Sequence, residues 1–155
     1  MTDTGDDPWT ELLEDADSLA ENYREAGWDA VAVSPTDVVA VDRGDRAGLE
    51  ALVTESVYDP VESLVKRDGA AFDRAEVYRR EVDDETHVLL AEADDETETT
   101  VVVPLAYTLE DARDVLEAAL EAGILQISVR PPSLEDGWVS VLHDEPSLFV
   151  DESRL

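Results

Sequence analysis

Three segments of the chain carry apolar residues at the three- and four-residue spacing of an amphipathic helix. The first begins at Pro8 and ends before Gly27, which is a common residue after a helix C-terminus. The third begins after Thr108, a residue typical of helix N-caps, and ends before Gly123. The pattern therefore predicts three helices, over about residues 8–26, 57–68 and 109–122.

Short runs rich in valine and other β-formers alternate with polar turns in the rest of the chain. Residues 28–33 and 38–41 are predicted to pair as a hairpin across the turn at 34–37. Three further runs, at 75–82, 86–93 and 98–105, predict a meander, and Pro104 indicates a strand end or edge. Two last strands are predicted at 124–130 and 138–143, whereas residues 48–53 fit a helix or a strand.

The order of these elements predicts an α+β fold. Short connections favour an antiparallel sheet, here of about seven or eight strands, with the three helices packed mainly on one face. The length of 155 residues predicts one domain over 1–155. Within it we expect a frayed tail at 1–6 and an acidic C-terminal segment at 144–155.

The charge of the chain restricts its partners and its setting. Forty Asp and Glu residues face 11 Lys and Arg residues, which gives a formal net charge of −29. Such a surface repels nucleic acid and anionic lipid. It is tolerable where dense salt screens self-repulsion, since the Debye length falls to about 3 Å at 1 M. We therefore expect a salt-adapted protein of the cytoplasm that binds neither nucleic acid nor membrane. An apolar run of membrane-spanning length and a basic secretory leader are both missing.

The sequence lacks the common signatures of catalytic and cofactor sites. It has no cysteine, and it contains neither a Gly-x-Ser-x-Gly elbow nor a phosphate-binding Gly motif. The triplet His143-Asp144-Glu145 resembles part of a divalent-metal site, but a histidine at a strand end beside a polar turn explains it better. We predict no cofactor, no metal site and no catalytic residue, and we lean against an enzyme.

Five residues are the candidates for a ligand-binding pocket. Arg79 and Arg80, on neighbouring positions of a predicted strand, must face opposite sides of the sheet. One of them is a candidate anion-binding group beside Tyr78, although ion pairs within the sheet explain both arginines better. His87 and His143, the two histidines of the chain, complete the set.

Two regions are candidates for an interface. Trp138 follows a glycine at a predicted strand start and is the tryptophan that we most expect to be partly exposed. The apolar segment Leu148-Phe149-Val150 lies within acidic sequence. It is either a docking element, in which Leu148 and Phe149 contact a partner, or the last strand of the sheet.

Three patches of the sequence resemble an uncharacterised family of small acidic haloarchaeal proteins. They are PWTELLEDADSLAENYREAGWDAVAVSPTDVVAV, VVVPLAYTLEDARDVLEAALEAG and WVSVLHDEPSLF. The resemblance implies a strand at residues 48–53, and it implies no activity, cofactor or functional residue.

We predict a non-catalytic protein-interaction or regulatory module that binds a protein partner or itself. The alternative is a small-ligand-binding protein or enzyme that uses the Arg/Tyr/His pocket. Convergence of these side chains in one pocket distinguishes the two hypotheses.

Overall fold

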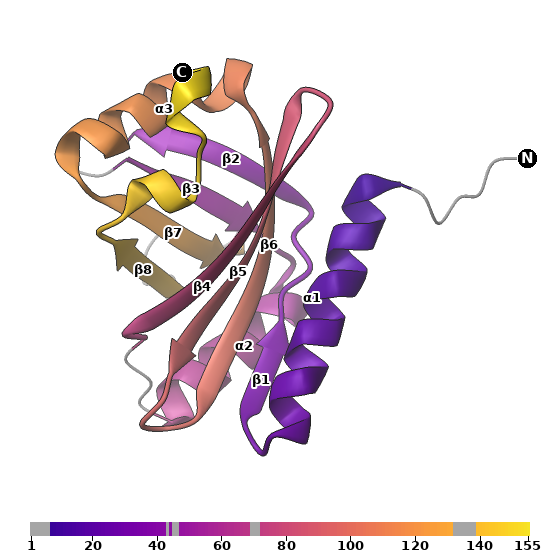
Figure 1. Cartoon of the computed structure of the whole chain (residues 1–155). Helices are drawn as coiled ribbons and strands as arrows, with labels where there is room; N and C mark the ends of the chain where they lie inside the picture. Colours follow the sequence, from indigo (N-terminus) through magenta and orange to yellow (C-terminus); the bar gives the residue numbers. More distant parts are fainter. Residues whose placement is uncertain (1–6, 43, 45–46, 69–71, 132–138) are drawn as a thin grey trace, which may run out of the picture.

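The fold is seen in a computed structural model, which describes residues 7–42, 44, 47–68, 72–131 and 139–155. Three helices and eight strands follow one another as a mixed α+β chain (Figure 1). The helices are α1 (Pro8–Glu25), α2 (Glu55–Asp68) and α3 (Leu109–Ala122). The strands are β1 (Asp29–Ala32), β2 (Asp37–Asp42), β3 (Ala47–Leu52), β4 (Arg74–Val82), β5 (Glu85–Asp94), β6 (Thr99–Thr108), β7 (Leu125–Arg130) and β8 (Val139–His143).

The eight strands form two sheets of four, and the prediction of one sheet of seven or eight strands is wrong. The first sheet has the order β1-β6-β5-β4, and the second has the order β2-β3-β7-β8. The β4–β5–β6 meander is antiparallel as predicted, whereas β1 pairs with β6 and β3 pairs with β7 in parallel. The strands of the two sheets run in different directions (Figure 1).

The predicted hairpin of residues 28–33 and 38–41 is also wrong, because its two strands belong to different sheets. The amide of Val33 donates to the carbonyl of Val102 in the first sheet at 2.8 Å. Three residues later the amide of Thr36 donates to Leu52 in the second sheet, also at 2.8 Å. Pro35, which has no amide hydrogen, lies at the crossing between the sheets.

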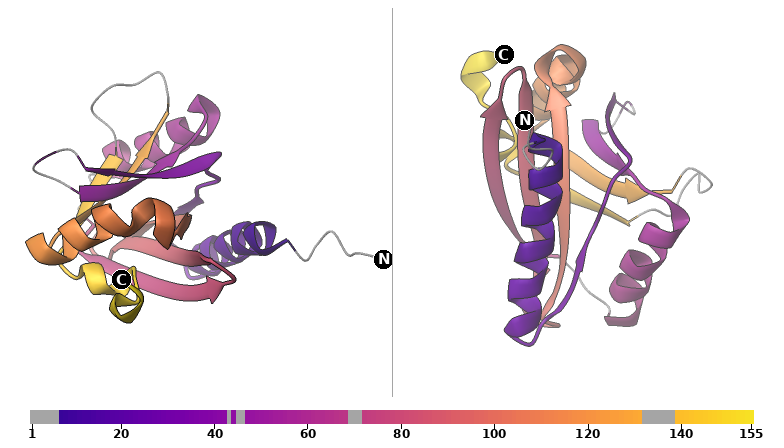
Figure 2. Two further views of the ribbon diagram at one scale, coloured as in Figure 1. Left: turned by 90° about the horizontal axis from the view of Figure 1, so that it is seen from above. Right: turned by 90° about the vertical axis from the view of Figure 1, so that its right-hand side faces the viewer.

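The main hydrophobic core lies between the two sheets. The inward faces of β5 and β6 meet the apolar faces of β3 and β7, and α2 and α3 add residues to this cluster. In Figure 2 these two helices lie at opposite ends of the molecule. Helix α1 instead covers the outer face of the first sheet, where Ala16 and Ala20 pack on Ala91 and Val102. The prediction that the three helices pack mainly on one face of one sheet is therefore wrong.

Local sequence signals explain most element boundaries. Thr108 caps α3 by accepting a hydrogen bond from the amide of Asp111 at 3.2 Å, and Gly123 ends that helix in the left-handed region. Residues 48–53 are almost entirely in β3, which confirms the strand alternative. Pro104 lies in β6 beyond Val102, the last residue of β6 that pairs with β1. The sheet therefore needs no hydrogen bond from the backbone nitrogen of Pro104 on that side.

Gly48 marks the closest approach between β3 and β7. A Cβ atom at this position would lie 2.5 Å from the carbonyl oxygen of Gln126, its parallel partner. The absence of a side chain is therefore a packing requirement of the second sheet.

Candidate functional site

The structure divides the five predicted ligand-binding residues between two pockets. Tyr78, Arg79, Arg80 and His87 line a pocket of about 170 Å³ that also contains Leu12, Asp15 and Leu89, which we call the α1 pocket. His143 lies in a second pocket, so the five side chains do not converge in one place.

Strand register explains how the α1 pocket is built. Arg80 lies opposite His87 and Tyr78 opposite Leu89 in the β4–β5 pair, so these four side chains share one face of the first sheet. Helix α1 covers this same face and adds Leu12 and Asp15. Alternation along one strand pair is a local pattern, so the grouping of Tyr78, Arg80 and His87 was predictable from the sequence, whereas the docking of α1 on this face was not.

The neighbouring arginines point to opposite sides, as the alternation of the strand predicts. Arg79 donates to the carbonyl of Ser147 at 3.2 Å and lies 3.4 Å from Glu81, on the face away from α1. It therefore ties β4 to the C-terminal segment. Arg80 is exposed and forms no ion pair with any described residue.

His87 is a buried histidine with one free nitrogen. Its ring Nε2 lies 3.0 Å from the carboxylate of Glu85, while the residue as a whole is 2% exposed. Across the described chain, Nδ1 of His87 is the one buried side-chain nitrogen or oxygen atom without a hydrogen-bond partner. Such an atom is costly to leave unpaired.

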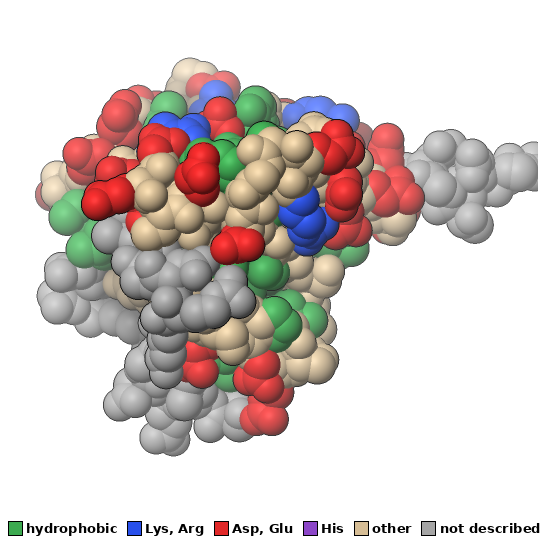
Figure 3. Space-filling model, turned by 90° about the horizontal axis from the view of Figure 1, so that it is seen from below, with side chains coloured by type: hydrophobic (Ala, Val, Ile, Leu, Met, Phe, Trp, Pro, Cys, Tyr) green, Lys and Arg blue, Asp and Glu red, His purple; other side chains and the backbone are tan. Residues whose placement is uncertain are grey.

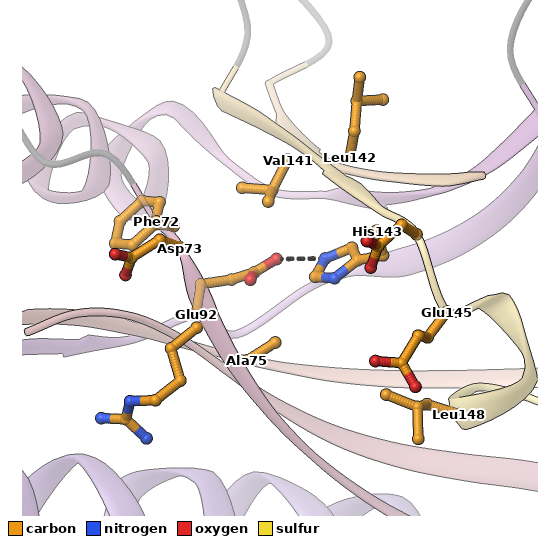
Figure 4. Close-up of a pocket in the computed structure, with 11 residues that line it drawn as sticks. Phe72, Asp73, Ala75, Glu92, Val141, Leu142, His143, Glu145 and Leu148 are labelled. Carbon is orange, nitrogen blue, oxygen red and sulfur yellow. Dashed lines mark hydrogen bonds and ion pairs between the residues drawn. The ribbon is translucent and has the colours of Figure 1, made fainter. Parts of the chain in front are cut away.

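The second pocket has a volume of about 180 Å³ and lies where the start of β4 approaches the end of β8 (Figure 4). We call it the junction pocket, because its walls come from both sheets and from the segment after β8. Its lining residues are Phe72, Asp73, Arg74, Ala75, Glu92, Val141, Leu142, His143, Asp144, Glu145 and Leu148.

A buried pair of Glu92 and His143 joins the two sheets in the junction pocket. The carboxylate Oε2 of Glu92 lies 2.7 Å from Nε2 of His143 (Figure 4). Both residues are at least nine-tenths buried, and the imidazole packs edge-on against Phe149 with ring centroids 5.1 Å apart. The remaining Oε1 of Glu92 and Nδ1 of His143 form no hydrogen bond with a described residue.

Carboxylates dominate the charge of the junction pocket. Asp73, Asp144 and Glu145 line the pocket with Glu92, and all three are exposed. The single arginine of the lining, Arg74, is already engaged by other residues. Its guanidinium donates to both oxygens of Asp95, which raises the pKa of Arg74, and it lies 3.6 Å from Glu76. The guanidinium carbon also lies 5.9 Å from the ring centroid of Trp28.

Glu92 was not singled out from the sequence, although a signal for it exists. Val88, Leu90 and Glu92 alternate along β5 and all face the core. A carboxylate that continues an inward-facing apolar series needs a buried partner. The sequence does not show which partner, because His143 is 51 positions away and in the other sheet.

The predicted interface residues differ in their exposure to solvent. Leu148 is 43% exposed, and Phe149 is fully buried in the main core. The carbonyl of Phe149 accepts a 2.6 Å hydrogen bond from the hydroxyl of Tyr107. Residues Pro146–Leu148 form a 3-10 turn, so this segment is not a last strand. Trp138 lies outside the described residues.

Two further properties concern metals and membranes. Within the described ranges, no group of three or more His, Asp and Glu side chains is arranged to hold a metal ion. None of the helices in that same part of the chain is both long and apolar enough to cross a membrane.

Comparison with protein-family models identifies a family for the chain. A protein-family model described only as a family of unknown function matches residues 1–151. Neither a curated protein nor a solved structure matches the chain.

Proposed function

The chain belongs to DUF7529, a family of unknown function, and from its junction pocket we propose that it is a salt-adapted, non-catalytic interaction module. In this proposal it works in a salt-rich cytosol and binds an extended, basic segment of a partner protein. The observation that carries the proposal is an apolar-rimmed pocket with a buried carboxylate at its base.

The rim of the pocket supports a protein partner. Leu142 and Leu148 are 47% and 43% exposed, and with Tyr78 they are the large hydrophobic residues that stand out in the described chain. Leu148 lines the junction pocket beside Phe72 and Val141, whereas the side chain of Leu142 points away from Glu92 and His143 (Figure 4). Apolar side chains gathered around a polar base are typical of protein contact sites.

The base and walls support a cationic group on the partner. Glu92 is 4% exposed and lines the pocket together with the carboxylates of Asp73 and Glu145 (Figure 4). A lysine or arginine of the partner places its aliphatic stem along the apolar rim and its charge at this base. Since molar salt screens distant charges, contacts inside the pocket decide the selectivity.

The position of the pocket supports an extended segment. β4 and β8 are the last strands of their sheets, and no described strand pairs with the outer edge of either. A peptide that enters the pocket therefore passes free backbone groups with which it can form ladder hydrogen bonds. A second copy of this chain is a poor occupant, because it has the same net charge of −29.

Binding of model peptides tests the proposal. In molar KCl, a fluorescent peptide of alternating valine and lysine is expected to bind saturably, whereas the valine–glutamate peptide does not. Glu92→Gln, which removes the charge and keeps the shape, is expected to weaken binding about tenfold or more. Leu148→Ser is expected to weaken it severalfold. Circular dichroism of each variant checks that the fold is retained.

Matched controls separate the pocket from the general acidity of the surface. Glu96→Gln removes an exposed carboxylate outside the pocket, and Tyr78→Ser removes an exposed apolar side chain on another face. Both are expected to bind the lysine peptide as the unaltered chain does. Equal weakening by Glu96→Gln and Glu92→Gln would show binding to the overall charge and would refute the proposed site.

A further inference from the structure

We propose that the α1 pocket is a separate binding site for a small organic carboxylate, with Arg80 and His87 as the two groups that hold the anion. This site lies on the outer face of the first sheet, whereas the junction pocket faces the core side. It is therefore independent of the interaction proposed above.

Arg80 is the first observation. The guanidinium of Arg79 is used within the fold, by Ser147 and Glu81, but Arg80 has no ion-pair partner in the described chain. This is notable in a chain with 40 Asp and Glu residues. A guanidinium keeps its charge at all accessible pH values and binds carboxylates through two parallel hydrogen bonds, so Arg80 is suited to this ligand.

His87 is the second and independent observation. Its Nε2 is occupied by Glu85, and its buried Nδ1 has no partner among the described residues. Arg80 lies directly opposite it in the strand pair. A carboxylate held by Arg80 supplies the missing partner when Nδ1 carries a proton, because the imidazolium then donates from both nitrogens. Seating the anion requires a small adjustment of the His87 ring, since Nδ1 is covered.

The other walls define the body of the ligand. Leu12, Leu89 and the ring of Tyr78 offer apolar surface. The volume of about 170 Å³ suits a small acid rather than a nucleotide. Asp15 also lines the pocket and repels a doubly charged anion more than a singly charged one. These features favour a monocarboxylate with an apolar body over inorganic phosphate.

Binding in this way takes up a proton. The charged and titratable groups facing His87 are Glu85 on its own strand, Arg80 and Tyr78 on β4, and Asp15 on α1. β6 contributes the apolar Ala106 opposite His87. Because binding takes up a proton, the affinity for a carboxylate is expected to rise as the pH falls.

Benzoate is the probe that tests the site. Nuclear magnetic resonance titration of the full chain in molar KCl is expected to show saturable shifts around Arg80 and His87. Arg80→Gln is expected to weaken benzoate binding about tenfold or more, because it removes a charge-assisted contact. Arg113→Gln is the matched control, since it removes the same charge from α3, outside the lining of the α1 pocket, and it is expected to leave the affinity unchanged.

Three outcomes overturn the proposal. They are equal binding of the neutral analogue benzamide, tighter binding of inorganic phosphate than of benzoate, and full affinity in Arg80→Gln. Calorimetry in two buffers of different ionisation enthalpy measures the proton uptake. Uptake is expected in the unaltered chain and absent in His87→Gln, and equal uptake in both excludes the role of His87.

Discussion

Tyr107 shows how one hydroxyl holds the C-terminal segment to the core. It donates to the buried carbonyl of Phe149 at 2.6 Å, from the end of β6. Tyr107→Phe leaves that carbonyl unpaired, so we expect it to lower the free energy of unfolding by about 1–3 kcal/mol. Urea denaturation in molar KCl measures this change. Tyr78→Phe, at an exposed position, is the control and is expected to have little effect.

The same residue makes stability depend on alkaline pH. Burial raises the pKa of Tyr107 to about 12, from the ordinary tyrosine value of 10.0. Between these values the unfolded chain loses the tyrosine proton while the folded chain keeps it, so stability falls as the pH rises. Below this window the contribution is fully present. Between pH 10 and about 12, we expect the free energy of unfolding to fall less in Tyr107→Phe than in the unaltered chain. Equal decreases in the two proteins would show that Tyr107 is not the cause of the pH dependence.

The residue contacts that the sequence could predict are those within one strand pair. Alternation along two neighbouring strands places Tyr78, Arg80 and His87 on one face, and the structure brings them together. Alternation does not reveal contacts between sheets. The pairing of Glu92 with His143 depends on how the second sheet docks, and 40 acidic residues offered no means of choosing among them.

At the scale of elements, local signals were enough to identify all three helices. An apolar stripe, a cap and a terminal glycine act within a few residues, and their consequences do not depend on the tertiary fold. Thr108 and Gly123, for example, bound α3 as predicted. The predicted start of the second helix, near residue 57, was less accurate, since α2 begins at Glu55.

The cap of α3 is open to a direct test. The Oγ1 of Thr108 accepts from the amide of Asp111 at 3.2 Å. Thr108→Ala is expected to reduce the free energy of unfolding by about 1 kcal/mol, since the first turn loses an acceptor. Thr108→Ser keeps the hydroxyl and is expected to restore most of the loss. If thermal melting shows that both variants are equally destabilised, the cap is not the cause.

The pairing of the strands was predicted less well than the helices. Two valine-rich runs separated by a four-residue turn are typical of a hairpin. Here β1 and β2 pair instead with β6 and β3. Each run is compatible with either partner, because a short apolar strand specifies burial and not the identity of its neighbour.

For the whole molecule, the net charge of −29 governs the conditions under which the fold is stable. Carboxylates are spread over the face shown in Figure 3, with few basic residues between them. Removing salt lengthens the range of their mutual repulsion. On dialysis from molar KCl to millimolar salt, we expect loss of ellipticity and a red shift of tryptophan emission. A cooperative melting transition that persists in dilute buffer would contradict this expectation.

Family membership agrees with the resemblance found in the sequence, because both lead to an uncharacterised family. A haloarchaeal origin remains a prediction from that resemblance, and a salt-rich cytosol remains a prediction from composition. The α+β class was also predictable, since helices and strands alternate irregularly and hairpins are short. The division into two sheets was not, because it arises from parallel pairs between distant strands.

Those parallel pairs bear on how the protein is made. Asp29 pairs with Thr99 and Gly48 with Gln126, so each sheet joins the first half of the chain to the second. A nascent chain that has emerged only as far as α2 exposes the valines of β1 and β2 with neither sheet complete. Pairing across such separations is slow. Aggregation or capture by a chaperone thus competes with folding during translation, until β6 and β7 have left the ribosome.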